Sequence, residues 1–418
     1  MKKFTFLFYV FTWSFFLANA QTATKPSGNG TEKTPYQIAT LEHLYWLSQS
    51  DSCWDKHFIQ TADIDASDSK NWDSNNGFSP VGNNTIKFSG TYNGKGHIIS
   101  GLNINRSATN NIGMFGYTGN GAEIDSIGLI KIDIAGKENV GGLAGNNKGS
   151  ISNSYCSGSV SGSSCIGGLT GYNWNSIKSS YSTGNTNGSV QTGGLTGYNN
   201  GNISNSYSTS KVAGNLGVGG LTGYNKNSIS NSYSSGKVTG TSKIGGLSGI
   251  NDGTINNSYW NRNTSGQSTS AGGSGLSSSE IKIKASLNGF DFSSTWGIKE
   301  DTTYAVLQGI NNAPFTFADS IVVKQSVDLD TLLNNDYDYE TLQDSLVYKV
   351  ISATAHYSSI SGHTFTFTTS ASVGQADTIN YQAGELLANG DTLWGNTARS
   401  LIYPSIDLNG GGTESTPY

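Results

Sequence analysis

Residues 140–165 read VGGLAGNNKGSISNSYCSGSVSGSSC, and this pattern returns in the following turns at steps of 26 residues. The Gly-Gly-Leu block at Gly141 begins again at Gly167, Gly193, Gly219 and Gly245. A second block, running from isoleucine to tyrosine, spans 151–155, 177–181, 203–207, 229–233 and 255–259. Neither block drifts, so an internal repeat of fixed length dominates the middle of the chain.

The unbroken step predicts a coil of β-strands in which each residue stacks on its equivalent one turn away. Helical repeats tolerate insertions between units, whereas a β-coil keeps its register. Within a turn, apolar positions alternate with Ser, Asn and Thr at the two-residue spacing of strands. We therefore predict an all-β fold, a right-handed parallel β-helix. Its columns of leucine, isoleucine and tyrosine, which start at Leu143, Ile151 and Tyr155, are expected to face a common interior.

A polar column follows the glycine blocks and consists of Asn147, Asn173, Asn199, Asn225 and Asn251. Amides stacked at about 4.8 Å can hydrogen-bond along the axis of a β-stack, so we assign these residues to a structural ladder. The Gly-Gly pair before each leucine indicates a corner. There, either a positive φ or a close approach of two backbones requires glycine.

Turns 140–155 and 244–259 resemble the GLUG motif repeat, a family found in bacterial adhesins and surface-attached immunoglobulin A peptidases. The resemblance extends outward to segments 35–40, 88–94 and 112–116, and it ends near 307–308. It implies a β-helix in a bacterial surface protein over residues 35–310. It implies no single activity, because these repeats accompany several functions.

The N-terminus has the pattern of a secretory signal peptide over residues 1–20. Lys2 and Lys3 precede an apolar run at 4–17, and Ala18-Asn19-Ala20 fits a cleavage site. A flexible segment is expected at 21–34. No later stretch is long and apolar enough to form a transmembrane segment. We therefore expect an extracellular protein, secreted or associated with a cell surface.

Composition argues against nucleic acid as a partner, and it does not decide whether the cysteines form a disulfide. Charged residues make up 13% of the chain and the net charge is −5, so no basic field attracts nucleic acid. The cysteines Cys53, Cys156 and Cys165 are too few for a disulfide framework. Cys156 and Cys165 either form one bridge or stay free.

Both ends of a β-coil need covers, because they expose unpaired strand edges. Residues 35–139 are expected to form an N-terminal cap and irregular early turns, with a helix capped by Thr40. Residues 140–260 form the regular turns. Residues 261–312 form the C-terminal cap, in which Ser277 and Glu280 make a capping box and Gly289 ends a helix. About seven turns are expected, or ~34 Å at the strand spacing.

Residues 313–408 lack the repeat and carry strand-like runs at 320–323, 345–351 and 364–369. They predict a small β-sandwich, and they resemble bacterial cadherin-like or immunoglobulin-like domains. Residues 409–418 read as a tail. Acidic side chains of this domain would supply oxygen ligands for calcium or form a solvated loop: Asp328, Asp330, Asp336, Asp338 and Glu340.

The regular turns argue against an enzyme. Between Val140 and Tyr259, Asp252 is the single acidic residue, and histidine and arginine are absent. A glycosidase needs two carboxylates, so the expected catalytic set is none. The alternative is a polysaccharide lyase or glycosidase that uses residues before the repeats: His57, Asp63, Asp65, Asp68, Asp73, His97, Arg106, Glu123 and Asp125.

A binding role has one aromatic column in its favour: Tyr172, Tyr198 and Tyr224. Such a row stacks on sugar rings if it faces solvent and belongs to the core if it faces inward. A third idea is ice binding by the serine column Ser154, Ser180, Ser206, Ser232 and Ser258. We favour a non-catalytic, adhesin-like protein whose partner is a glycan or an extracellular matrix or host-surface ligand.

Overall fold

The structure is a computed structural model that describes residues 22–310 and, beyond them, the backbone of eight strands. These strands are β35 (Ser320–Val323), β36 (Ser326–Asp328), β37 (Leu346–Ala353), β38 (Tyr357–Ser361), β39 (Thr364–Phe367), β40 (Asp377–Leu386), β41 (Thr392–Trp394) and β42 (Ala398–Pro404). The predicted strands at 320–323, 345–351 and 364–369 coincide with β35, β37 and β39. Strands β35, β42, β40, β37 and β41 form one sheet, and β36, β39 and β38 form another. Their packing as a sandwich stays a prediction.

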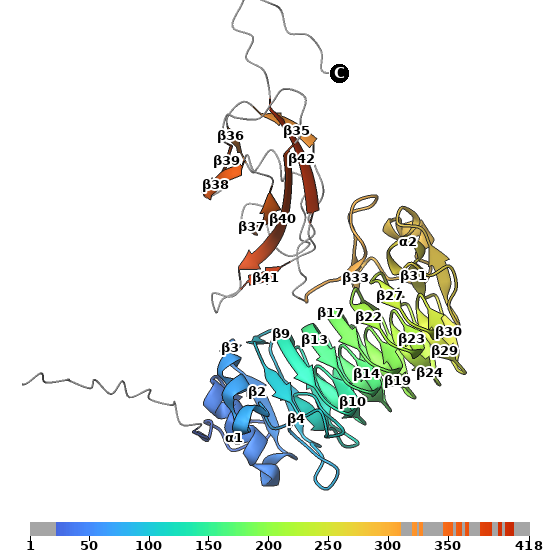
Figure 1. Cartoon of the computed structure of the whole chain (residues 1–418). Coiled ribbons are helices and arrows are strands. Elements are labelled where there is room, and N and C mark those ends of the chain that lie inside the picture. The colour runs from blue at the N-terminus through green and yellow to red at the C-terminus, as the bar shows by residue number, and fades with distance from the viewer. Residues whose placement is uncertain are drawn as a thin grey trace, which may run out of the picture.

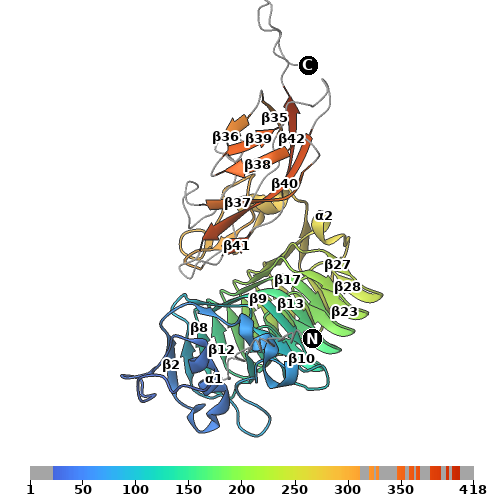
Figure 2. The same cartoon turned by 60° about the vertical axis from the view of Figure 1, so that its left-hand side comes forward.

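Residues 36–276 wind into a parallel β-solenoid (Figures 1 and 2). A nine-stranded sheet runs along it and sets the count at about nine turns within this range. It contains β1 (Tyr36–Ile38), β2 (His57–Gln60), β4 (Thr91–Asn93), β8 (Glu123–Asp125), β12 (Ser150–Ser152), β16 (Ser176–Lys178), β20 (Asn202–Ser204), β25 (Ser228–Ser230) and β30 (Thr254–Asn256).

Three further sheets run beside it, and the five regular turns contain strands of all four sheets. The twelve-stranded sheet contains β3 (Ile64–Asp65), β5 (Ile98–Ser100), β6 (Asn103–Asn105), β9 (Gly128–Ala135), β13 (Tyr155–Ser161), β17 (Tyr181–Asn187), β21 (Tyr207–Ser208), β22 (Lys211–Ala213), β26 (Tyr233–Ser234), β27 (Val238–Thr239), β31 (Tyr259–Asn261) and β32 (Ser274–Leu276). The five-stranded sheet contains β10 (Glu138–Gly141), β14 (Ser164–Gly167), β18 (Val190–Gly193), β23 (Leu216–Gly219) and β28 (Ser242–Gly245). The six-stranded sheet contains β7 (Phe115–Tyr117), β11 (Ala144–Asn147), β15 (Thr170–Asn173), β19 (Thr196–Asn199), β24 (Thr222–Asn225) and β29 (Ser248–Asn251).

The register follows the repeat. Ile151 pairs with Ile177, and Asn147 pairs with Asn173, in parallel strands of adjacent turns. The leucine column from Leu143 and the isoleucine column from Ile151 to Ile229 are fully buried in one interior core. The nine-stranded sheet makes the coil about nine turns long, which is longer than the seven turns expected. Strands β1 and β2, which lie in the segment assigned to the N-terminal cap, already pair as turns.

The N-terminal helix forms within these first turns. Helix α1 spans Leu41–Gln49, and the Thr40 hydroxyl accepts a hydrogen bond from the backbone amide of His43 at 3.3 Å. Leu44 and Leu47 are buried in the interior core. The 3-10 helices η1 (Asp51–Cys53), η2 (Ser67–Asn71) and η3 (Asp73–Asn75) follow it in the early turns.

The tyrosine column faces outward, which corrects the prediction of a shared interior. Cys156 lies in the interior core, so Tyr155 before it on the same strand lies on the other side. The cause is the left-handed corner at Asn153, with a φ of 47°, which turns Ser154 inward instead of the tyrosine. The rings of Tyr155 and Tyr181 stack with centroids 4.8 Å apart and planes 2° apart.

The segment after the last turn covers this tyrosine column. Helix α2 (Arg262–Ser265) and β32 close the stack, and residues 276–310 then pack Ile281, Phe290 and Trp296 on the tyrosines. The Tyr233 hydroxyl donates to the Ala305 carbonyl at 2.7 Å. Strands β33 (Trp296–Gly297) and β34 (Val306–Leu307) pair in antiparallel fashion here.

The capping box forms, but the helix it was expected to start does not. The Ser277 amide donates to Glu280 Oε2 at 2.7 Å, and the Glu280 amide donates to Ser277 Oγ at 3.2 Å. Only the short 3-10 helices η4 (Glu280–Lys282) and η5 (Lys284–Ser286) follow before Gly289. Extended backbone at Ile283 separates them, and packing of Ile281 and Leu287 against the tyrosine cluster outweighs helix propensity.

Close approach, and not positive φ, explains the Gly-Gly pairs. A Cβ at Gly194 would lie 2.1 Å from the Gly220 carbonyl oxygen of the next turn. The left-handed backbone falls instead on non-glycine residues such as Cys165 and Asn153. The three cysteines are free, because Cys156 lies inside the coil while Cys165 lies at a corner and donates to Gln191 Oε1 at 3.1 Å.

Candidate functional site

The six-stranded sheet carries the predicted aromatic column on its outer side. Strand pairing aligns Tyr117, Asn146, Tyr172, Tyr198 and Tyr224 in one row. Neighbouring residues on these strands, such as Asn147 and Asn173, are fully buried, whereas the three predicted tyrosines are half-buried. The column therefore faces solvent and does not belong to the core.

The rings of this row contact one another, and a tryptophan joins them. Tyr172 and Tyr198 stack with centroids 4.4 Å apart and planes 17° apart. Trp174, which is 43% exposed, stacks on Tyr172 at 4.7 Å. Tyr224 tilts by 56° from Tyr198. We call Tyr117, Tyr172, Trp174, Tyr198 and Tyr224 the aromatic strip.

Two lysines lie on rings of the strip. The Lys148 ammonium is 5.6 Å from the Tyr117 ring centroid and 5.5 Å from that of Trp174, so it lies between the two rings. The Lys87 ammonium is 5.2 Å from the Tyr117 centroid. Lys87 also continues the row, because its neighbour Phe88 pairs with Thr118. These are cation–π contacts, which position an ammonium without neutralising it.

An acidic residue lies at the other end of the strip. The Tyr224 hydroxyl donates a hydrogen bond to the carboxylate of Asp252. This hydrogen bond is the main cause that raises the pKa of Tyr224 to about 12. The hydroxyl of Tyr224 is therefore a donor throughout the neutral range. Burial also raises the pKa of Tyr172.

The predicted asparagine ladder runs beneath the strip. Each Nδ2 donates to the Oδ1 of the next turn, at 3.0 Å from Asn147 to Asn173 and 2.8 Å from Asn173 to Asn199. The same contact continues to Asn225 at 2.8 Å and to Asn251 at 2.7 Å. The ladder satisfies buried amides and fixes the strand register from which the aromatic strip projects.

The serine column is internal, so the ice-binding idea is wrong. Ser154 and its four equivalents are buried. The Ser154 hydroxyl donates to the Ser152 carbonyl at 2.6 Å, and the Ser180 hydroxyl accepts from the Ser154 amide at 3.2 Å. These hydroxyls satisfy backbone groups at a corner and present no array to solvent.

The residues of the enzymatic alternative make local structural contacts. The His97 ring and the Ile98 amide both contact Asp63 Oδ1, at 3.1 and 2.9 Å. Asp65 Oδ1 accepts from the Ser67 amide at 2.9 Å, near Asp68 in η2. The two carboxylates thus bind different segments: Asp63 binds residues 97–98, and Asp65 binds the start of η2.

The remaining candidates lie elsewhere on the early turns. Arg106 pairs with Asp73 at 2.8 Å. His57 contacts the Thr91 hydroxyl at 3.0 Å. Asp125 Oδ1 accepts from Ser152 at 2.6 Å, and Glu123 lies on the same strand β8. Within the described residues, no three His, Cys, Asp or Glu side chains are grouped to hold a metal.

The calcium candidates fall outside the described side chains. Asp330, Asp336, Asp338 and Glu340 lie outside the described residues, and only the backbone of Asp328 is described. Calcium binding there stays a prediction.

The predicted site residues did not include Trp174, Tyr117, Lys87 and Lys148. Trp174 lies two residues beyond Tyr172, and this spacing alone would place it beside that ring on an outer surface. Tyr117 and Lys87 lie before the regular turns, where the step between equivalent residues exceeds 26; Thr118 and Asn147, for example, are 29 apart. Column alignment by the repeat could not find them.

The fold and the strip define a parallel β-solenoid built from repeated turns. Residues 214–239 match a known family, the GLUG motif. The chain is also similar to two larger proteins, and no solved structure matches it. No described helix has the length and apolar character needed to span a membrane.

Both relatives are matched over about a third of this chain. It is 36% identical over 136 residues to halomucin of Haloquadratum walsbyi, which covers 32% of this chain and 2% of halomucin. It is 33% identical over 144 residues to a putative Gly-rich membrane protein of Evansella cellulosilytica, covering 33% of this chain and 16% of that protein. This chain therefore matches only a small part of the length of each relative.

Proposed function

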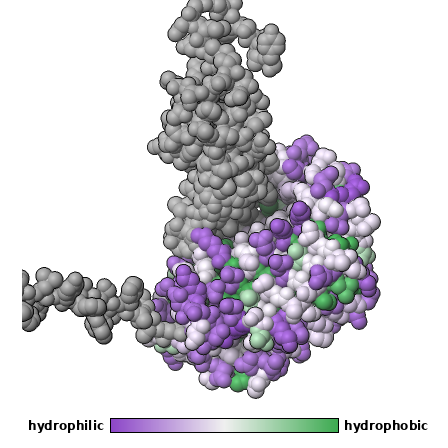
Figure 3. Space-filling view, in the orientation of Figure 1, coloured by the Kyte–Doolittle hydropathy of each residue, from purple (hydrophilic) through white to green (hydrophobic). Residues whose placement is uncertain are grey.

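We propose that this protein acts outside the cell, secreted or held at a cell surface, and binds a glycan through the aromatic strip without catalysis. The observation that carries this proposal is a row of half-buried rings on the outer side of a regular sheet. Figure 3 shows the surface of the solenoid in the view of Figure 1, with hydrophilic and neutral areas and small hydrophobic patches. Aromatic rings with polar edges suit ligands that are apolar on one side and hydroxylated on the other.

The ring geometry limits how a sugar would bind. Tyr172 and Tyr198 cover one another's faces, so they offer ring edges and hydroxyls. Trp174 is the most exposed ring, and Tyr224 tilts out of the stack. Because Tyr172 and Lys148 contact the ring of Trp174, a glycan would meet the exposed edge of Trp174, the ring face of Tyr224 and the hydroxyls between them.

The relatives support a surface location. One is named halomucin and the other a putative Gly-rich membrane protein. Neither name designates an enzyme. Matrix proteins and host-surface proteins are the competing ligands for an adhesin-like protein.

The test is an array of glycans and matrix proteins probed with the full chain and with a Trp174→Ala, Tyr198→Ala variant. The matched control is Tyr45→Ala, which removes a half-buried tyrosine from α1 outside the strip. We expect glycan binding that the strip variant loses and the control keeps. Binding to matrix proteins alone, or release of oligosaccharides from a bound polysaccharide, would contradict the proposal.

A further inference from the structure

We propose that the strip binds an acidic polysaccharide, whose carboxylate or sulfate groups contact Lys87 and Lys148. This inference rests on the proposed function and names the ligand class. It starts from the position of the two ammonium groups, which lie on ring faces of Tyr117 and Trp174 at the N-terminal end of the strip. A ligand that follows the row of rings would reach both groups.

Neither ammonium has an acidic partner in the part of the chain that the structure describes. Among the described residues, neither Lys87 nor Lys148 forms an ion pair with an aspartate or a glutamate. A ring face stabilises the cation but leaves its N–H donors available for oxygen acceptors. Both lysines are therefore held in place with N–H donors that can bind a ligand.

The local charge is opposite to that of the chain as a whole. The full chain carries a net charge of −5. The strip and its adjoining corner contain three basic residues, Lys87, Lys148 and Lys226, and one acidic residue, Asp252. The carboxylate of Asp252 already accepts a hydrogen bond from Tyr224. Charge complementarity therefore favours an anionic ligand on this surface over a neutral one.

The Tyr224–Asp252 contact shows the chemistry on which such a ligand would depend. A carboxylate lies at the end of the strip and accepts a hydrogen bond from a tyrosine hydroxyl of the row. The carboxylate of an acidic sugar could make the same contact with Tyr198, one turn away from Tyr224. Lysine at one end and phenol hydroxyls along the row would then both bind acidic groups.

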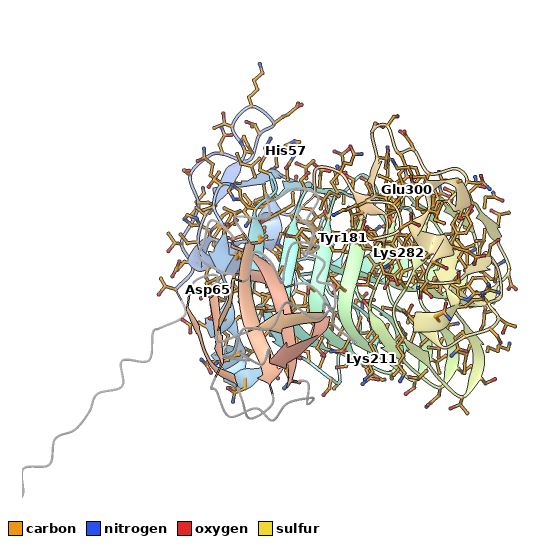
Figure 4. The ribbon with its side chains drawn as sticks, turned by 90° about the horizontal axis from the view of Figure 1, so that it is seen from above. His57, Asp65, Tyr181, Lys211, Lys282 and Glu300 are labelled. Atoms are coloured by element: carbon orange, nitrogen blue, oxygen red, sulfur yellow. The ribbon has the colours of Figure 1, made fainter. Side chains whose placement is uncertain are left out.

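The test compares polysaccharides that differ only in charge. Dextran sulfate is paired with dextran, and polygalacturonate with its methyl ester, in affinity electrophoresis of the full chain. The lysine variant is Lys87→Gln, Lys148→Gln. The control is Lys211→Gln, a lysine on the twelve-stranded sheet that Figure 4 shows at the opposite edge of the coil from His57. Thermal melts of all variants check that the fold is kept.

We expect tighter binding of each acidic polymer than of its neutral partner, and a loss of about tenfold in the lysine variant but not in the control. Binding of neutral dextran as tight as dextran sulfate would overturn this inference and leave the proposed function standing. An equal loss in the Lys211→Gln control would overturn it as well. Binding of no polysaccharide at all would overturn both proposals.

Discussion

Asn173 Nδ2 donates to Asn199 Oδ1 at 2.8 Å, and both amides are fully buried between adjacent turns. Asn199 in turn donates to Asn225 Oδ1 and accepts at Oδ1 from the Gly201 amide. A single side chain therefore serves its own turn and both neighbouring turns. Its removal affects three turns at once.

Replacement of Asn199 by alanine is expected to lower the free energy of unfolding by about 2–4 kcal/mol, because it leaves a buried donor on Asn173 and a buried acceptor on Asn225 without partners. Chemical denaturation measures the change. Asn200→Ala, at the half-exposed neighbouring position, should have an effect below about 0.5 kcal/mol. Equal losses in the two variants would contradict a ladder role.

Gly194→Ala is expected to prevent the turns from stacking at their normal spacing. The added Cβ would lie 2.1 Å from the Gly220 carbonyl oxygen and 2.1 Å from Ser208 Oγ, and the backbone contact has no freedom to move away. The control is Gly119→Ala, whose Cβ would meet side chains no closer than 3.4 Å. Soluble yield and circular dichroism should separate the two. A Gly194→Ala protein that melts like the control would show that close approach does not fix this corner.

Tyr233→Phe should loosen the C-terminal segment from the flank of the coil. The substitution removes the 2.7 Å hydrogen bond to the Ala305 carbonyl and leaves that buried acceptor without this partner, at a cost of about 1–2 kcal/mol. Hydrogen exchange of residues 296–307 reports on it. Tyr117→Phe, which changes a half-buried hydroxyl on the aromatic strip, should leave exchange there as in the parent protein. No change in exchange for Tyr233→Phe would refute the contact.

The pKa of Tyr224, raised to about 12 by the Asp252 carboxylate, predicts a pH effect at the strip. A phenol with a raised pKa contributes stability at pH values below its ordinary pKa of 10.0, and this contribution is lost as the pH rises toward 12. Asp252→Asn should move the ionisation of one tyrosine down toward 10.0. Ultraviolet titration of phenolate in both proteins measures it, and Tyr224→Phe identifies the residue. Superimposable titration curves would exclude the interaction.

The periodic part of the fold could be predicted from the sequence because each regular turn has the same pattern of buried and exposed positions. Leucine, isoleucine and asparagine columns occupy the inside positions that a step of 26 residues implies. The tyrosine column was placed on the wrong side, because a left-handed corner at Asn153 shifts the alternation by one residue. Such a corner has no glycine to mark it in the sequence.

Part of the candidate site could not be predicted for a related reason. Tyr172, Tyr198 and Tyr224 occupy successive turns, whereas the repeat position of Lys148 is occupied in the following turns by Trp174, Asn200, Lys226 and Asp252. Lys148 reaches the strip because its turn places it between Tyr117 and Trp174, which belong to different turns. Only the pairing of the irregular turns with the regular ones brings these groups together.

The amide ladder has one further consequence, for the way such a protein can change in size. Each regular turn donates to the next one through the amide group that also accepts from the turn before it, as Asn147, Asn173 and Asn199 show. A whole turn could therefore be duplicated or deleted between identical neighbours without leaving an unmatched surface. The length of such a coil therefore changes by whole turns. Each turn that is added or removed also adds or removes one position in the row of rings offered to a ligand.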